Sequence, residues 1–204
     1  MSLTLLDWRR TVFAMYADVR ATVATDPTGT LERFRNAKDA LFASRPDTPI
    51  TAADRPGFDG LSYWPYDPTK RFEVEVEPLE PVGMPSISGT GDVYPLDRIG
   101  RIALPMGPLD VYWVAVYGGG VFIPFRDATN GDETYGAGRY LLDTVKGADL
   151  GGTGGRLIVD FNYAYHPSCT YDPKWSCPLA PPANRLSVPI RAGERLVPAP
   201  TAGR

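Results

Sequence analysis

Clusters of glycine separate short apolar segments between residues 110 and 163, and this spacing constrains the fold more than any other feature of the sequence. Each segment has the length of a strand, and glycine readily adopts the positive φ that tight connections need. The segment at 110–117 is apolar on both faces, so we expect it to lie centrally in a sheet. Turns at 118–120, 130–131 and 151–155 then predict an antiparallel β-meander in which each strand pairs with the next.

Further strands are predicted on either side of this region. Apolar residues alternate with charged ones at 71–77, which is typical of a strand with one solvated face. Strands are also expected near 83–90 and 98–104, and a last one at 185–190. Pro189 cannot donate to a strand ladder, so this last strand is placed on an edge or at a bulge.

The N-terminal region predicts two helices. Apolar residues recur at three- and four-residue steps over 5–23, with Thr4 as a cap, and the mixed charge between them favours packing on a core over binding to a membrane surface. A second helix is expected over 31–43, with Thr30 as its cap. The segment 44–70 contains five prolines and a group of aromatic residues that we expect to pack onto the core.

These elements predict an α+β fold, mainly an antiparallel β-meander that forms a barrel or sandwich, with the two N-terminal helices packed on it. We expect one domain over 1–195, with the helices in 5–43 and the β-rich part in 71–190. Residues 196–204 are expected to form a flexible tail.

Composition excludes several classes of partner. The net charge of −3 and the isoelectric point near 5.2 argue against a nucleic-acid-binding protein, which needs a basic face. No apolar run approaches the roughly 20 residues that span a bilayer, and charged residues interrupt any signal-peptide core near the N-terminus. We therefore expect a cytoplasmic protein with neither nucleic acid nor membrane as partner, in which Cys169 and Cys177 are reduced.

The stretch 121–142 combines glycines with many charged and aromatic side chains. Asn130 and Gly131 are the strongest local signal for a two-residue hairpin turn, because both central positions of that turn need positive φ. Such a turn places Asp127 opposite Thr134 and Arg126 opposite Tyr135. Arg126, Glu133 and Tyr135 would then share one face, and Asp127 and Thr134 the other.

Arg139 is the residue most strongly predicted to need a partner. It follows Gly-Ala-Gly and precedes an apolar pair, so we expect its guanidinium to be buried. A buried arginine cannot become neutral and must find an anion. Asp127, Glu133 and Asp160 are the available carboxylates, and an anionic substrate is the alternative.

Asp160 and Asn162 are expected to lie side by side on one face of the predicted strand at 156–163. If they are buried they need partners, and Arg126 and Arg139 are the obvious candidates. A structural network that fixes strand register and a ligand site both fit this pattern.

The loop at 164–178 contains the single histidine and both cysteines of the chain. His166, Cys169 and Cys177 are potential metal ligands, but their spacing lacks the short Cys-x2–4-Cys motif of zinc sites, and we expect no metal. A Cys–His nucleophilic pair would need a third group to orient the imidazole, and the sequence identifies none. Two buried thiols are the expected outcome, and a strained disulfide is the alternative.

Several motifs in this order resemble the prokaryotic domain-of-unknown-function 1684 family. The motifs are PFRDATNGDETYGAGRYLLD at 124–143, VDFNYAYHPSC at 159–169 and CPLAPPANRLSVPIRAGE at 177–194, preceded by KDALFASRPDTPI at 38–50 and FDGLSYWPYDP at 58–68. The resemblance covers about residues 33–195. It implies membership and no particular activity, cofactor or substrate. The sequence differs from the family pattern at His166, where Asn is expected, and at Ala183, where Glu is expected.

Two classes of function fit these observations. The first is a small-molecule enzyme or ligand-binding barrel without a cofactor, whose polar pocket takes an anionic, partly apolar ligand. The second is a non-catalytic structural or interaction protein whose polar network is architectural. The residues predicted to line the pocket are Arg126, Asp127, Thr134, Tyr135, Arg139, Asp160, Asn162, Tyr165, His166 and Cys169.

Overall fold

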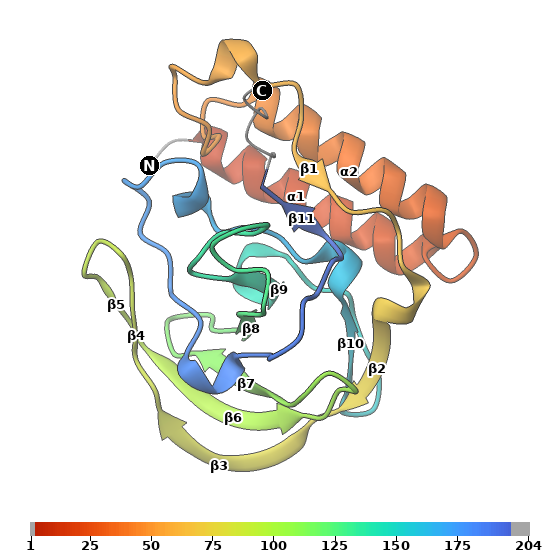
Figure 1. Ribbon diagram of the computed structural model, residues 1–204, viewed down its shortest axis with the longest axis vertical. Coiled ribbons are helices and arrows are strands. Elements are labelled where there is room, and N and C mark those ends of the chain that lie inside the picture. Colours follow the sequence, from red (N-terminus) through yellow and green to blue (C-terminus); the bar gives the residue numbers. More distant parts are fainter. Residues whose placement is uncertain (1–2, 197–204) are drawn as a thin grey trace, which may run out of the picture.

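The computed structural model describes residues 3–196, in which two helices pack side by side against one end of a set of curved antiparallel strands (Figure 1). The helices are α1 (Leu3–Thr22) and α2 (Pro27–Ser44). A five-stranded sheet forms the opposite end of the molecule, with β3 as its outermost strand. The sheets do not close into a barrel over the described residues, so the arrangement is a sandwich-like α+β fold.

Both predicted helices are present, but the second begins earlier than predicted. Asp26 caps α2, because its side chain accepts a hydrogen bond from the Gly29 N–H and Pro27 follows at the first helical position. Thr30 therefore lies inside the helix, where its hydroxyl bonds to that of Thr22. Thr4 likewise lies within α1. The predicted caps were wrong, because an aspartate followed by proline is the stronger start signal.

The large sheet contains most of the predicted meander. Its strand order is β3-β6-β7-β8-β9. The bounds are β3 (Glu77–Gly83), β6 (Leu96–Ile102), β7 (Leu109–Val114), β8 (Val121–Phe125) and β9 (Arg139–Asp143). β7 lies in the middle, as its apolar faces predict, and is buried over its first four residues. Two prolines in β3 are compatible with its position at the edge.

The three remaining sheets are two-stranded pairs between segments distant or adjacent in sequence. β2 (Arg71–Glu75) pairs with β10 (Arg156–Asp160), β1 (Ser62–Tyr63) with β11 (Glu194–Arg195), and β4 (Ser86–Ile87) with β5 (Val93–Tyr94). The meander prediction was therefore wrong at β10, which pairs with β2 and not with β9. Short 3-10 helices occupy Arg55–Gly57, Pro68–Lys70, Thr144–Lys146, Phe161–Tyr163, Ser168–Thr170 and Pro182–Asn184.

The strand predicted at 185–190 does not form. Its one ladder contact is an isolated bridge between Arg185 and Arg126. Farther along, the carbonyl of Ile190 accepts a hydrogen bond from the Arg139 guanidinium. Backbone hydrogen bonds also hold this segment against the residues that follow β8: the Leu186 N–H donates to the Arg126 carbonyl, and the Ala128 N–H donates to the Val188 carbonyl. The predicted tail begins at Leu196, whose N–H donates to the backbone carbonyl of Glu133. The other residues of the predicted tail lie outside the described part of the chain.

The predicted two-residue hairpin is replaced by a compact loop between β8 and β9. Strand pairing stops at Phe125 opposite Arg139, and Gly131 has φ +90° while Asn130 keeps a negative φ. The Asp127 carboxylate accepts the N–H and the hydroxyl of Thr129. This local side-chain turn satisfies the backbone early and prevents the ladder from continuing. The predicted cross-strand pairs of Asp127 and Thr134 and of Arg126 and Tyr135 therefore do not occur.

The core lies between the helices and the concave side of the strands. Met15, Tyr16 and Val19 of α1 and Phe34 of α2 pack into it, and Phe34 makes an edge contact with Tyr163. Aromatic residues of 44–70 join the core as predicted: Trp64 is buried, and Phe58 stacks on Phe42. Within residues 3–196, no helix is both long and apolar enough to cross a membrane.

Substitutions at two glycines with positive φ distinguish the cost of backbone strain alone from the cost of strain combined with a steric clash. A Cβ on Gly131 would have open space, whereas a Cβ on Gly193 (φ +77°) would lie 2.4 Å from the Ala164 carbonyl oxygen. We expect Gly131→Ala to lower the free energy of unfolding by about 1–2 kcal/mol, the cost of a left-handed alanine. Gly193→Ala should cost about 4 kcal/mol or more, because backbone atoms must also move. Urea denaturation measures the free energy of unfolding of both variants. Equal losses of stability would contradict the assignment of strain alone to Gly131 and of an added clash to Gly193.

Candidate functional site

The guanidinium of Arg139, at the start of β9, is fully buried and its hydrogen-bond partners are all protein groups. Its Nη2 donates to Asp127 Oδ2 and to the Ile190 carbonyl, each at 2.7 Å. Its Nη1 donates to the carbonyls of Ala192 at 2.6 Å and of Glu194 at 3.1 Å. The guanidinium carbon lies 5.2 Å from the centre of the Trp64 ring. Arg139 thus has a protein carboxylate, one of those predicted, as its anion.

The other donors around Asp127 complete this network. Its Oδ2 also accepts the Ile190 N–H at 3.1 Å, and its Oδ1 accepts the Thr129 N–H at 2.9 Å. The ion pair is dry, because neither side chain is exposed. Its geometry fastens the segment 190–194 to the sheet and leaves no carboxylate oxygen free for a ligand. The Nε of Arg139 is buried without a hydrogen-bond partner among the described residues.

Asp160 and Asn162 form a second, separate structural cluster. The Asn162 side-chain amide donates to Asp160 Oδ1 at 2.8 Å. The predicted shared strand face was wrong, because β10 ends at Asp160 and Asn162 lies in the 3-10 helix Phe161–Tyr163. The same amide group exchanges two hydrogen bonds with the backbone of Asp67. The nearest cation is Arg71, 3.9 Å from Asp160 Oδ2, and not Arg126 or Arg139 as predicted. Burial raises the pKa of Asp160 above its ordinary value.

The remaining predicted residues of the 121–142 stretch also bond within the fold. Arg126 donates from Nε to the Ala137 carbonyl at 3.3 Å, and Thr134 is buried against Thr129. The backbone N–H of Tyr135 donates to His166 Nε2, and the Tyr135 hydroxyl bonds to Cys169. Glu133 points to Arg191 and so does not share a face with Arg126.

A buried carboxylate that the sequence did not predict, Glu194, lies where β11 passes under α2. It forms an ion pair with Lys38, and both side chains are nearly inaccessible. Its Oε2 accepts the backbone N–H of His166 at 2.7 Å and the Tyr171 hydroxyl at 3.1 Å. Burial alone would raise the pKa of Glu194, but Lys38 and these contacts outweigh burial and lower that pKa.

One half of this pair had a signal in the sequence. Lys38 follows Leu31 and Phe34 on the apolar side of α2, where a lysine is out of place. A charge at such a position needs a buried counter-ion. Glu194 had no local signal, because its partner is 156 positions away.

His166 is held as a neutral imidazole. Its Nε2 accepts the Tyr135 N–H at 3.3 Å, so the proton is on Nδ1, which faces Glu194 Oε2 at 3.7 Å. Burial lowers its pKa to about 4. An imidazole whose acceptor nitrogen is already bonded to the backbone cannot take a proton from a substrate without breaking that bond. His166 is a positioning residue in this geometry.

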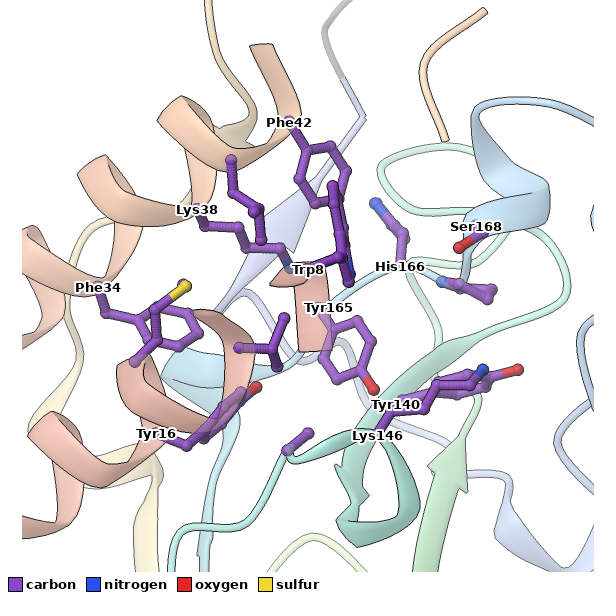
Figure 2. A pocket seen from close by; sticks show the side chains of 15 residues that line it. Trp8, Tyr16, Phe34, Lys38, Phe42, Tyr140, Lys146, Tyr165, His166 and Ser168 are labelled. Atoms are coloured by element: carbon purple, nitrogen blue, oxygen red, sulfur yellow. The ribbon is translucent and has the colours of Figure 1, made fainter. Parts of the chain in front are cut away.

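Above this group a cavity of about 110 Å³ lies between the helices, β9 and the segment that follows β10 (Figure 2). Aromatic and aliphatic side chains form most of its wall, and Lys38 and Lys146 supply two cations. The lining residues are Trp8, Val12, Met15, Tyr16, Phe34, Lys38, Leu41, Phe42, Tyr140, Lys146, Ala148, Tyr165, His166, Pro167 and Ser168. Of the residues predicted from sequence, Tyr165 and His166 are on this wall and the others are not.

Two tyrosine hydroxyls at this cavity, those of Tyr16 and Tyr165, make no hydrogen bond to the described residues. Burial raises the pKa of both phenols well above its ordinary value, so both stay neutral and can donate. In Figure 2 the Tyr165 hydroxyl points to the side of the cavity where Lys146 and Tyr140 lie. The Lys38 ammonium lies under the Tyr165 ring, 4.6 Å from its centre. Donors therefore outnumber free acceptors here.

The two cysteines lie behind this wall and are both free thiols. The Cys169 N–H donates to Cys177 Sγ at 3.4 Å. His166 is not a hydrogen-bond partner of either thiol. Among residues 3–196, no group of three or more His, Cys, Asp or Glu side chains has an arrangement that could hold a metal ion.

Comparison with known proteins gives a family and a related structure. Residues 56–195 match the family model described as "Protein of unknown function (DUF1684)". The solution NMR structure of an uncharacterized protein of Haloarcula marismortui is similar, with 33% sequence identity and a TM-score of 0.59. The alignment covers 85% of this chain and 96% of that one. No curated protein matches the sequence.

The Arg139 network predicts a large stability loss when its charge is removed. Arg139→Met keeps the volume of the stem but leaves the Asp127 carboxylate buried without a cation, so we expect the free energy of unfolding to fall by about 3–5 kcal/mol. Arg191→Met is the matched control, since it breaks an equally short but solvent-exposed pair with Glu133 and should change stability little. Denaturant unfolding checks both, and a stable Arg139→Met would show that the network is dispensable.

The buried imidazole predicts how stability depends on pH. The unfolded chain protonates His166 near pH 6.5, whereas the folded chain does so near pH 4. The unfolded state therefore binds more protons in this window, and stability should fall by about 3 kcal/mol as the pH is lowered from 6.5 to 4. His166→Gln, whose Oε1 can replace Nε2 as acceptor, should remove this part of the pH dependence. If stability depends on pH in the same way in the wild type and in His166→Gln, this assignment to His166 is refuted.

Proposed function

This chain belongs to the DUF1684 family of proteins of unknown function, and we propose that it binds a small, mainly apolar carboxylate in the cavity between the two helices and the sheet. The observation that carries the proposal is the combination of an aromatic wall with donors that lack partners. The cavity of about 110 Å³ is of the order of the 150 Å³ that holds a benzene ring in an engineered protein. A ligand with one ring or a short branched chain fits this volume.

The charges at the cavity favour an anion over a neutral or cationic ligand. Lys38 is already neutralised by Glu194, but Lys146 has only Asp143 at 3.8 Å, and its side chain is half exposed. A carboxylate between Lys146 and the Tyr165 hydroxyl would receive a cation and a neutral donor. The aromatic rings would cover the apolar part of the molecule, as in most small-molecule sites.

The same geometry argues for binding without catalysis. The buried His166 uses its acceptor nitrogen on the backbone, and the Glu194 oxygens are bonded to Lys38, Tyr171 and the His166 N–H. No side chain at the cavity is thus arranged as a free general base beside a nucleophile. The role as a structural or interaction protein is the second candidate, favoured by the architectural nature of the Arg139 network.

A thermal-shift titration tests the proposal with benzoate and its neutral analogue benzamide as probes. A ligand that binds only the native state raises the melting temperature, by the equivalent of about 2.7 kcal/mol at a hundredfold excess over Kd. We expect benzoate to give the larger shift. Val12→Phe, which fills the cavity from α1, should abolish both shifts without lowering stability.

The charge requirement is tested with a matched pair of lysines. Lys146→Met should reduce the benzoate shift to that of benzamide, because it removes the cation at the mouth of the cavity. Lys70→Met is the control: it breaks a similar pair, with Asp67 three residues earlier, far from the cavity lining. No shift with any compact carboxylate, or an undiminished shift in Val12→Phe, would reject the proposal and favour the interaction role.

A further inference from the structure

The two cysteines of the chain lie together although the sequence spacing gives them no known motif. The backbone N–H of Cys169 donates to Cys177 Sγ at 3.4 Å, so the Cys177 sulfur lies against the backbone of the other cysteine. The hydroxyl of Tyr135 bonds to Cys169 from the loop between β8 and β9. Cys177 is buried, and Cys169 is partly exposed. Their mutual contact is what disulfide formation requires first.

The surroundings give the two sulfur atoms different protonation states. The hydrogen bond from Cys169, together with the N–H groups of Cys169 and Ser168, lowers the pKa of the Cys177 thiol to about 6. The same contact raises the pKa of Cys169. A donated N–H stabilises the charged form of the sulfur that receives it, so the contact between the Cys169 N–H and Cys177 Sγ favours Cys177 as the more acidic thiol of the pair.

We infer that Cys169 and Cys177 form an oxidation site that hydrogen peroxide converts into an intramolecular disulfide. The Cys177 thiolate attacks one oxygen of the peroxide, the O–O bond breaks, and sulfenic acid forms with release of hydroxide, which takes up a proton to give water. The Cys169 sulfur then attacks the Cys177 sulfur, the S–O bond breaks, and a second water leaves with the Cys169 proton. Two thiols and one peroxide thus give one disulfide and two waters.

The position of the pair gives this oxidation a structural consequence. The disulfide would close the loop that contains Tyr171, whose hydroxyl donates to Glu194. At the other end of that loop, the Pro178 carbonyl accepts the hydroxyl of Tyr140, a residue of the cavity wall. The inference does not rest on the proposed ligand, because the thiols can be counted without it.

Thiol titration and mass spectrometry of the full chain test this inference. The chain has two cysteines, so the reduced protein should show two thiols after unfolding. Protein treated with peroxide at neutral pH should show none and a mass lower by about 2 Da, the two lost hydrogens, and dithiothreitol should restore both thiols. Thiols that persist while N-acetylcysteine in the same solution is oxidised, or a mass gain of oxygen without disulfide, would overturn it.

Single variants test which sulfur reacts first. In Cys169→Ser, the Cys177 thiolate keeps two backbone donors and a hydroxyl, so peroxide should give a sulfenic acid that dimedone traps. In Cys177→Ser, the remaining thiol should react at least tenfold more slowly at pH 7, since its protonated form predominates. Equal trapping rates in the two variants would overturn the assignment of Cys177 as the reactive sulfur. Circular dichroism confirms that each variant is folded.

Discussion

The buried guanidinium of Arg139 is the interaction on which the rest of the structure depends. It donates to one carboxylate and to three carbonyls of the segment 190–194, none of which belongs to a ladder with β9. The side chain therefore adds to the short β1–β11 ladder in fastening this segment to the rest of the fold. Since the guanidinium keeps its proton, the charge that holds this network on the arginine side does not change with pH.

That anchoring also determines the position of the second buried charge. Because the backbone at Glu194 is bonded to Arg139, its carboxylate is placed under α2, where it meets Lys38, Tyr171 and the His166 N–H. Two members of this group, Lys38 and His166, also line the cavity. Arg139 therefore holds the segment 190–194 to the sheet, and Lys38 joins that segment to α2. The cavity lies at this contact between the sheet and the helices.

Local patterns predicted the elements, and long-range pairings were beyond them. The helices, the central strand β7 and the need of Arg139 for an anion follow from periodicity and from the cost of a buried charge. The β2–β10 pairing and the Lys38–Glu194 contact join segments far apart in sequence, and neither strand nor helix signals indicate such partners. The two-residue hairpin predicted at Asn130 and Gly131 does not form, because the Asp127 side chain accepts hydrogen bonds that end the strand ladder early. The pocket was predicted at the polar cluster, whereas most residues that line the cavity are aromatic or aliphatic.

The Lys38–Glu194 pair has a consequence for how the protein is made. The two residues are 156 positions apart, so α2 leaves the ribosome long before its counter-ion is synthesised. Until then the ammonium of Lys38 has no counter-ion, and the loop that must close spans 156 positions. The ribosome must therefore synthesise residue 194 before this ion pair can form, and a nascent chain that stops earlier leaves a lysine on the apolar side of α2 unpaired.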